Sequence, residues 1–380
     1  MTSHSEVSGK GQMKALFISN SSGGMYSFRR EVVEAVGKQA ETWLCAPDDA
    51  RAEYWQQSEC HYIPFSFNRH GTNPVKELGM IRYYRKLLKE IRPDIVFTYT
   101  IKPNVYGGMA CAGLHIPYIA NVTGLGDSIE NGGLMQKVST TLYRLGLRKA
   151  SCVFFQNETN RQFFIDRGIL SGKSRRIPGS GVNLEIHCPE NYPEDEEETR
   201  FLFVARIKRE KGIEELLSAI REIRKERPDC IVEILGECEG DYRDRLNKAE
   251  AEGDIRYYGP QSDVHKYYKN CHCVILPSWH EGTSNVLLEG AATARPVIAT
   301  RIPGCMETFE EGITGFGCEA KDAGSLAEAM RRFLKLTKAE RAQMGRAGRE
   351  KVARDYDRKI VIDAYLEEMT CATAKGETKQ

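Results

Sequence analysis

Two glutamates eight residues apart, Glu281 and Glu289, frame the stretch of this chain whose residue types are best suited to chemistry. The apolar run 273–277 before them is typical of a buried strand. Between the glutamates lie small polar residues and the first apolar residue of an expected helix: Gly282, Thr283, Ser284, Asn285 and Val286. A helix that begins just after a parallel strand offers free N–H groups and a positive dipole end to a diphosphate.

The two carboxylates fit the other parts of a sugar nucleotide. Glu289 lies about one turn inside the expected helix, within reach of a ribose diol. Glu281 precedes the helix and can accept hydrogen bonds from sugar hydroxyls. An isolated pair of this kind has a simpler explanation, with Glu281 as a helix cap and Glu289 on a solvated face. The spacing alone therefore does not decide between these interpretations.

A second predicted strand is also followed by residues suited to phosphate. The apolar run 201–205 leads into a basic turn that contains Arg206 and Lys211. Arginine offers a planar fork of donors and lysine a compact charge, so both can converge on a diphosphate. Lys208 and Arg209 in the same turn are interpreted as a solvated charge run.

With these residues in this order, the second half of the chain resembles the family 4 retaining glycosyltransferases, whose fold is called GT-B. The resemblance implies that Arg206 and Lys211 bind the donor phosphates and act in catalysis. It also implies that Glu281 contacts the donor sugar during transfer and that Glu289 contacts the ribose. The residues 282–286 then belong to the donor site.

Two glycine turns extend the likeness to nearly the whole chain. Gly23 and Gly24 follow the first predicted strand, where the family has a glycine loop that lets the backbone approach the donor diphosphate. Gly259 lies in the turn 257–260, where the family places backbone groups against the base and a tyrosine could stack. A tight turn explains the first pair equally well, and a surface turn explains the second nearly as well.

The first half of the chain offers candidates for binding an acceptor. Lys102 and Asn104 follow one predicted strand, and Thr123 and Asp127 follow another. These segments resemble the subgroup that extends polyprenyl-diphosphate-linked sugars in bacterial surface-polysaccharide or glycoprotein pathways. Many members have a histidine where this chain has residues 123–127, so the resemblance assigns no acid/base residue.

The stretch 134–149 is expected to form an amphipathic helix. One stripe is apolar, and basic residues are available to face anionic lipid headgroups: Leu134, Val138, Leu142 and Leu145 on the stripe, with Lys137, Arg144, Arg148 and Lys149 beside it. Such a helix can lie on a membrane. A core helix with a basic outer face explains the pattern equally well.

The composition sets broader limits. The chain has 380 residues and a formal net charge of +1, with 54 basic and 53 acidic residues, which gives no indication of a nucleic-acid partner. Its 12 cysteines follow no disulfide or metal-ligand spacing, and the segment 271–273 is interpreted as the entry to a strand, with structural thiols. Without a signal peptide or an apolar run of about 20 residues, a cytoplasmic protein is expected, with peripheral contact to the inner face of the plasma membrane as an option.

Apolar β-rich runs alternate with helical patterns, which is typical of parallel sheets. Strands are expected near residues 14–19, 42–46, 94–99, 118–122, 152–156, 201–205, 231–235, 255–258, 273–276 and 297–300. The GT-B resemblance implies an α/β fold with two Rossmann-like parallel-sheet domains facing a central cleft. The expected segments are a disordered extension 1–12, an acceptor-binding domain 13–180, a nucleotide-sugar-binding domain 181–358, a helix 359–369 that packs back on the first domain, and a disordered tail 370–380.

The resemblance thus implies a metal-independent retaining transferase that moves a hexose unit from a UDP-sugar to a hydroxyl of a lipid-linked saccharide, without a cofactor. Arg206, Lys211 and helix N-termini would stabilise the departing diphosphate. Two alternatives stay open: a sugar-nucleotide epimerase of the same fold, and a non-catalytic protein that binds sugar nucleotides.

Overall fold

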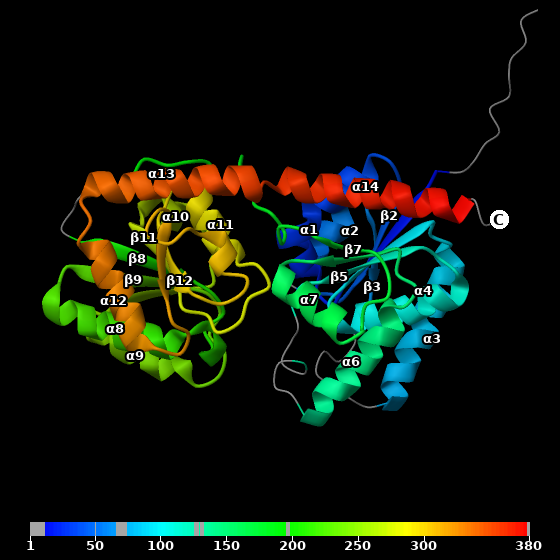
Figure 1. Ribbon diagram of the computed structural model, residues 1–380, viewed down its shortest axis with the longest axis horizontal. Helices are drawn as coiled ribbons and strands as arrows, with labels where there is room; N and C mark the ends of the chain where they lie inside the picture. The colour runs from blue at the N-terminus through cyan, green and yellow to red at the C-terminus, as the bar shows by residue number, and fades with distance from the viewer. Residues whose placement is uncertain are drawn as a thin grey trace, which may run out of the picture. The chain divides into compact units, whose positions relative to one another are not determined.

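The computed structural model describes residues 12–49, 51–65, 74–124, 129, 133–194 and 198–377. The chain forms two compact units (Figure 1). Unit 1 contains the residues up to Ile177 together with those from Ile362 onward, and unit 2 is Pro178–Val361. The two units are described separately below.

Unit 1 is built on a parallel sheet with the strand order β3-β2-β1-β4-β5-β6-β7. The strands are β1 (Lys14–Ile18), β2 (Glu41–Ala46), β3 (His61–Pro64), β4 (Ile95–Tyr99), β5 (Tyr118–Val122), β6 (Cys152–Phe155) and β7 (Ser174–Arg176). The helical segments are α1 (Ser22–Gly37), α2 (Ala52–Gln57), α3 (Pro74–Ile91), the π-helix η1 (Pro103–Gly107), α4 (Gly108–Leu114), α6 (Gly133–Leu147) and α7 (Glu158–Asp166).

Unit 2 repeats this topology with a parallel sheet in the order β10-β9-β8-β11-β12-β13. The strands are β8 (Thr199–Val204), β9 (Cys230–Leu235), β10 (Ile255–Gly259), β11 (Cys273–Leu276), β12 (Val297–Thr300) and β13 (Gly315–Cys318). The helices are η2 (Arg209–Lys211), α8 (Ile213–Glu226), α9 (Tyr242–Ala251), α10 (His265–Asn270), α11 (Asn285–Ala292), η3 (Met306–Thr308), α12 (Ala323–Leu334), α13 (Lys338–Asp355) and α14 (Arg358–Glu377), which continues into unit 1.

Both sheets follow the Rossmann strand order, which reverses direction beside the first strand. The reversal lies between β1 and β4 in unit 1 and between β8 and β11 in unit 2. In open α/β sheets, ligands bind in the crevice outside the carboxyl ends of these two strands. The loops after β8 and β11 contain Arg206, Lys211 and Glu281, so the topology of unit 2 places the predicted donor residues at such a point.

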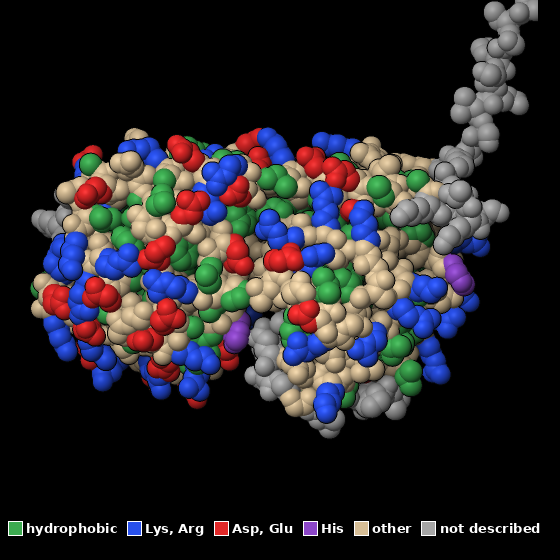
Figure 2. All heavy atoms as spheres, in the orientation of Figure 1, with side chains coloured by type: hydrophobic (Ala, Val, Ile, Leu, Met, Phe, Trp, Pro, Cys, Tyr) green, Lys and Arg blue, Asp and Glu red, His purple; other side chains and the backbone are tan. Residues whose placement is uncertain are grey.

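Burial explains why the predicted strands form. Each residue of β4 and of β11 is buried, as expected for parallel strands covered by helices on both faces. Helix α8 buries one apolar stripe that includes Ile213, Leu216 and Ile220 and leaves its acidic and basic residues outside. On the face of the molecule that Figure 2 shows, basic and acidic side chains are interspersed, in keeping with the near-zero net charge.

All the strands predicted from the sequence are present, and three further strands are not predicted by it. The first two, β3 and β7, lie at the edges of their sheet and have few buried residues, so they lack an apolar signal. The third, β13, contains two glycines, Gly315 and Gly317. Glycine is depleted in strands, which explains why this segment was missed.

The last helix packs on the sheet of unit 1. The ring of Tyr365 lies 5.5 Å from that of Phe97 and 5.0 Å from that of Phe154, and its hydroxyl donates a hydrogen bond to Asn121. The expectation of a disordered tail from residue 370 is wrong for residues 370–377, because α14 continues to Glu377 and buries Ala372. Of the proposed N-terminal extension, residues 1–11 lie outside the described part of the chain.

Candidate active site

The loops after β8 and β11 in unit 2 are joined by hydrogen bonds. The backbone N–H of Trp279 donates to the carbonyl of Glu210 over 2.9 Å, and the hydroxyl of Ser278 donates to the same oxygen over 3.2 Å. The ring of Trp279 also lies 5.3 Å below the guanidinium of Arg209. The basic turn and the loop that carries Glu281 therefore form one structural element at the carboxyl edge of the sheet.

Within this element, Lys211 and Glu281 form an ion pair. The Lys211 Nζ lies 2.5 Å from Glu281 Oε1, and the two side chains are only 20% and 15% exposed. Partial burial reduces screening by solvent, so each charge fixes the position of the other. Folding thus brings together two residues that are 70 positions apart in sequence and that were both predicted to contact the donor.

Two glycines allow these loops to approach so closely. Gly212, directly after Lys211, has φ +75°, and a Cβ there would lie 2.1 Å from the carbonyl oxygen of Pro277. Gly304 has φ +85°, and a Cβ there would lie 2.5 Å from the carbonyl oxygen of Glu281. Both positions therefore require glycine, for its left-handed backbone and for its lack of a side chain.

Helix α11 begins where the sequence predicts. Ser284 is its N-cap, and the serine side chain accepts a hydrogen bond from the N–H of Leu287. The N–H of Ser284 itself donates to the carbonyl of Gly304 over 2.9 Å. Thr283 is buried, whereas Gly282, Asn285 and Val286 are partly exposed. This capped N-terminus provides a positive dipole end next to the Lys211–Glu281 pair.

Glu289 lies one turn into α11 and is partly buried, so the solvated-face interpretation is wrong. Its Oε2 accepts a hydrogen bond of 2.8 Å from the hydroxyl of Tyr268 in α10. Burial raises the pKa of the Glu289 carboxyl to about 6, and the hydrogen bond from Tyr268 opposes this rise. A carboxylate held in this way can accept hydrogen bonds from a diol.

Arg206 extends from the same sheet edge but does not join the ion pair. Its side chain is 59% exposed, and its guanidinium lies 2.9 Å from the carboxylate of Glu239, in the loop after β9. Exposed pairs of this kind are weak, so a phosphate can compete with Glu239 for the arginine. No pattern in the sequence indicates that Glu239 is the partner of Arg206.

The turn expected to contact a base is held by its own residues. Gly259 has φ +67° at the end of β10. The hydroxyl of Tyr257 donates to the carbonyl of Gly236 over 2.8 Å, and its ring lies 4.9 Å from the guanidinium of Arg243. Tyr258 is 38% exposed, so of the two tyrosines it has the more accessible ring.

In unit 1, an acidic side chain occupies the glycine turn after β1. Asp49 accepts hydrogen bonds from the N–H of Gly23 over 2.7 Å and from the hydroxyl of Ser21 over 2.8 Å. Ser21 in turn caps α1 by accepting from the N–H of Gly24 over 3.0 Å. These two N–H groups, assigned to the donor diphosphate by the resemblance, thus have partners within unit 1. Asp49 was missed because it follows a different strand, β2.

The residues predicted to bind an acceptor differ in their surroundings. Lys102 pairs with Glu77 over 2.8 Å, and both side chains are largely shielded. Asn104 has 0% exposure and is part of the sheet framework, where its amide donates to the carbonyl of Asn121 over 2.8 Å. Because Asn104 is fully buried within the π-helix η1, the structure does not support its direct contact with an acceptor. Thr123 is partly exposed after β5, and Asp127 lies outside the described residues.

Helix α6 exposes apolar side chains that a core helix would bury. Met135, Val138 and Leu145 are 50%, 45% and 47% exposed. Its buried face consists of Ser139, Tyr143, Gly146 and Leu147, and Leu142 is partly buried against the core. Of the predicted apolar stripe, Val138 and Leu145 face outward, whereas Leu142 packs against the core, so the stripe is only partly confirmed.

The basic residues of this segment have two different environments. Lys137, Arg148 and Lys149 are exposed. Arg144 instead donates hydrogen bonds of 2.9 Å to the carbonyls of Arg167 and Gly168, beyond α7. Three of the four predicted basic residues therefore remain candidates for contact with an anionic surface. The side chain of Leu134 lies outside the described part of the chain.

The interpretation of Cys271 and Cys273 as structural thiols is confirmed, and the strand β11 begins at Cys273. Cys271 and Cys273 are fully buried, and His272 uses Nδ1 to accept the backbone N–H of Arg200 over 3.0 Å. All twelve cysteines lie in the described part of the chain and are free thiols. No second group of cysteines and histidines has metal-ligand spacing in the sequence, but the fold brings His265 next to Cys188 and Glu190, and these three side chains could hold a metal ion.

The sequence of this chain matches two protein families that divide it much as the structure does. The family "Glycosyl transferase 4-like" matches residues 15–157, and the family "Glycosyl transferases group 1" matches residues 188–351. Among curated proteins, the chain is 26% identical to the N,N'-diacetylbacillosaminyl-diphospho-undecaprenol alpha-1,3-N-acetylgalactosaminyltransferase of Campylobacter jejuni, over 93% of this chain and 97% of that protein. It is 22% identical to the capsular polysaccharide biosynthesis glycosyltransferase CapM of Staphylococcus aureus, over 85% and 88% of the respective chains.

Solved structures share the fold at low sequence identity. HepE of Anabaena, in complex with UDP and glucose, has a TM-score of 0.77 and 18% identity, covering 94% of this chain and 100% of that one. The sucrose-phosphate synthase of Thermosynechococcus elongatus has a TM-score of 0.76 and 19% identity, covering 97% and 100%. With its two Rossmann-like parallel sheets and its two matched domains, the chain belongs to the GT-B glycosyltransferases that combine a 4-like domain with a group 1 domain.

Proposed function

We propose that this glycosyltransferase moves a sugar from a UDP-sugar to a hydroxyl of a polyprenyl-diphosphate-linked saccharide, with retention of anomeric configuration and without a metal ion. The observation that carries the donor assignment is the Lys211–Glu281 ion pair beside the N-terminus of α11. The full-length similarity to a transferase named for an undecaprenol-linked acceptor supports the acceptor class.

The donor fits this site in three parts. Its diphosphate lies toward Lys211 and the first turn of α11, where cationic charge and the helix dipole stabilise it. The sugar hydroxyls donate to Glu281, which Lys211 holds in place. The ribose hydroxyls donate to Glu289, which Tyr268 orients. The two carboxylates thus recognise the two ends of the donor.

Transfer requires stabilisation of negative charge on the leaving diphosphate. In this proposal Lys211 provides it from a fixed position, and Arg206 adds its charge after exchanging Glu239 for phosphate oxygens. Attack on the same face of the sugar, with the leaving diphosphate accepting the proton of the acceptor hydroxyl, would give retention without a protein nucleophile. Cationic side chains then perform the electrostatic role that a metal ion has in other transferases.

The exposed face of α6 suits an acceptor that is anchored in a membrane. Met135, Val138 and Leu145 can enter the headgroup region while Lys137 and Arg148 contact anionic lipids. Among the described residues, no helix is both long and apolar enough to cross a bilayer. We therefore propose peripheral contact through α6, on the cytoplasmic side where nucleotide sugars are available.

One experiment separates the proposal from its alternatives. UDP-sugar consumption is measured with and without a polyprenyl-diphosphate-linked saccharide. A transferase releases UDP at a rate that depends on the acceptor, and NMR of the product reports the anomeric configuration. An epimerase would convert the donor without acceptor, and a sugar-nucleotide-binding protein would bind UDP without turnover. Either of these results would overturn the proposed transfer.

A further inference from the structure

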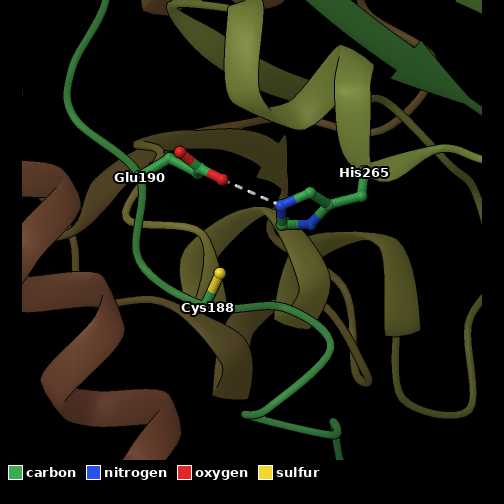
Figure 3. A group of neighbouring side chains, drawn as sticks. All are labelled: Cys188, Glu190 and His265. Carbon is green, nitrogen blue, oxygen red and sulfur yellow. Dashed lines mark hydrogen bonds and ion pairs between the residues drawn. The ribbon is translucent and has the colours of Figure 1, made fainter.

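Three side chains with metal-ligating atoms converge in unit 2, apart from the proposed donor residues. Cys188 and Glu190 lie on the segment that leads to β8, and His265 begins α10. Their ligand atoms all lie within 4.8 Å of one another, and the sulfur, carboxylate and imidazole face a common space (Figure 3). His265 is 75 residues from Glu190, so the cluster exists only in the folded chain.

The ligands differ in accessibility. Glu190 Oε1 and His265 Nε2 lie 3.0 Å apart, and these side chains are 19% and 26% exposed. This contact holds the carboxylate and the imidazole in place. Cys188 is exposed. An ion can therefore enter from the cysteine side and meet two ligands that are already ordered.

The backbone beneath the cluster is fixed from several directions. The N–H of Glu190 donates to the carbonyl of Thr293 over 3.3 Å, and the guanidinium of Arg295 donates to the carbonyl of Glu190 over 3.2 Å. On the other side of Cys188, Arg349 donates to the carbonyl of His187 over 2.8 Å. The cysteine and the glutamate therefore need little backbone movement to bind an ion.

We propose that Cys188, Glu190 and His265 bind one thiophilic divalent cation of the Zn²⁺ type. Thiolate, imidazole and carboxylate are the three protein ligands that zinc uses, at distances of about 2.0 to 2.3 Å, whereas Mg²⁺ and Ca²⁺ select oxygen ligands. Three protein ligands leave a fourth tetrahedral position for water. On binding, the thiol releases its proton to solvent, and bonds from the ion to Glu190 and His265 replace their mutual hydrogen bond.

Nearby cations limit the affinity of this site. Lys269 Nζ lies 3.5 Å from the second oxygen of Glu190, and Arg349 acts electrostatically on Cys188. The two anionic ligands balance the charge of a divalent ion, and the two cations oppose it. Lys269 is 59% exposed and can turn toward solvent, so its opposition is weaker than its distance indicates.

An ion at this position would also fix α10, which orients the proposed ribose carboxylate. Tyr268, three residues after His265, donates to Glu289, and the ring of His187 lies 6.0 Å from the rings of both His265 and Tyr268. Bonding His265 to the segment 188–190 cross-links α10 to the chain that precedes β8. Unit 2 should therefore unfold at a higher temperature with the ion than without it.

The test uses the full-length chain after treatment with EDTA and desalting, with Co²⁺ as a spectroscopic probe for Zn²⁺. A thiolate-to-cobalt absorption band should appear, saturate at one ion per chain and disappear when ZnCl₂ is added. Cys188→Ser should abolish the band. Glu190→Gln and His265→Gln should each weaken binding at least about tenfold, the effect expected for loss of an ordered contact at a metal. Cys371→Ser, at the other exposed cysteine, is the matched control and should bind as the wild type does.

Three results would overturn the site. They are an absent band in the wild type, a band that persists in Cys188→Ser, and wild-type affinity in both the glutamate and the histidine variants, which would indicate a lone surface thiol. Circular dichroism verifies that each variant is folded. The measurement contains no donor or acceptor, so its failure leaves the proposed transferase activity intact, and failure of that activity leaves the ion site intact.

Discussion

The hydroxyl of Tyr268 donates a hydrogen bond of 2.8 Å to Glu289 and thereby joins α10, which precedes β11 in the chain, to α11, which follows it. This contact orients a carboxylate that burial makes costly to ionise. A carboxylate kept at a cost in stability is typical of binding sites, since a ligand that donates hydrogen bonds can offset the cost. The pair therefore links the stability of unit 2 to recognition of the nucleotide.

Replacing Glu289 by glutamine should separate nucleotide binding from sugar transfer. Glu289→Gln keeps the shape but removes the charge that ribose hydroxyls bind, so the dissociation constant of UDP should rise by about tenfold or more, as for a hydrogen bond to a charged group. Glu281→Gln should bind UDP normally and lose transfer. Calorimetric titration with UDP measures the contrast, with Glu328→Gln at an exposed position of α12 as control. Unchanged UDP binding in Glu289→Gln would contradict the ribose assignment.

The raised pKa of Glu289 predicts opposite pH dependences for stability and for UDP affinity. Its pKa is about 6 in the folded chain against 4.5 for an ordinary glutamate. The neutral carboxyl therefore favours folding below pH 4.5, and this contribution, about 2 kcal/mol at most, is lost as the pH rises through about 6. UDP needs the carboxylate, so its affinity should increase over the same range. Thermal unfolding and titration at several pH values measure both, and both trends should vanish in Glu289→Gln.

Loss of the cationic residues should impair catalysis more than folding. Arg206→Ala and Lys211→Ala should each lower kcat/KM. The expected loss of transition-state stabilisation is about 2–4 kcal/mol, as for one electrostatic contact in a preorganised site. Arg206→Ala should unfold at the wild-type temperature because the side chain is exposed. Lys208→Ala, in the same turn, is the matched control and should retain full activity.

In Lys211→Ala, the Glu281 carboxylate loses its ion-pair partner, so a loss of stability adds to the loss of catalysis. The double variant Lys211→Ala/Glu281→Gln removes both charges and should recover any lost stability but no activity. Wild-type kinetics in either the Arg206 or the Lys211 single variant would show that this residue does not bind the donor.

Transferase activity should persist after chelation. The proposed site binds the diphosphate through cationic side chains and the N-terminus of α11, so EDTA should leave turnover within about twofold of the untreated rate. The same result is expected for Cys188→Ser, since the proposed ion site does not contact the donor. Activity that disappears in EDTA and returns with Mg²⁺ or Mn²⁺ would show that a metal ion takes part in transfer.

Neutralising the exposed basic residues on α6 and directly after it should weaken membrane binding. Replacement of Lys137, Arg148 and Lys149 by glutamine should reduce sedimentation with anionic liposomes, because each basic residue near such a surface contributes about 1 kcal/mol. Transfer to a short water-soluble acceptor should continue. A variant with glutamine at Arg85, Lys86 and Lys89, all exposed on α3, removes the same charge and is the control. A wild-type protein that does not bind the liposomes even at low salt would contradict the proposed contact.

Local signals in the sequence were sufficient for ten of the thirteen strands in the described part of the chain and for the placement of the donor loops. Buried parallel strands are continuous apolar runs, and helix starts depend on the capping residue next to them, as at Ser284. Since parallel strands present their carboxyl ends at one edge, the sequence places Lys211 and Glu281 at the same edge of the sheet, and the pairing of β8 with β11 in the fold makes them neighbours. The resemblance to the glycosyltransferases supplied the roles of these residues.

Tertiary structure alone decided which partners these residues have. The sequence does not indicate that Asp49 accepts from Gly23, that Tyr268 orients Glu289, or that Glu239 pairs with Arg206. It gave no sign of the cluster of Cys188, Glu190 and His265. The physical reason is the same in each case: hydrogen bonds and ion pairs form between side chains that folding brings within a few ångströms, and a short sequence window contains only one of the two partners.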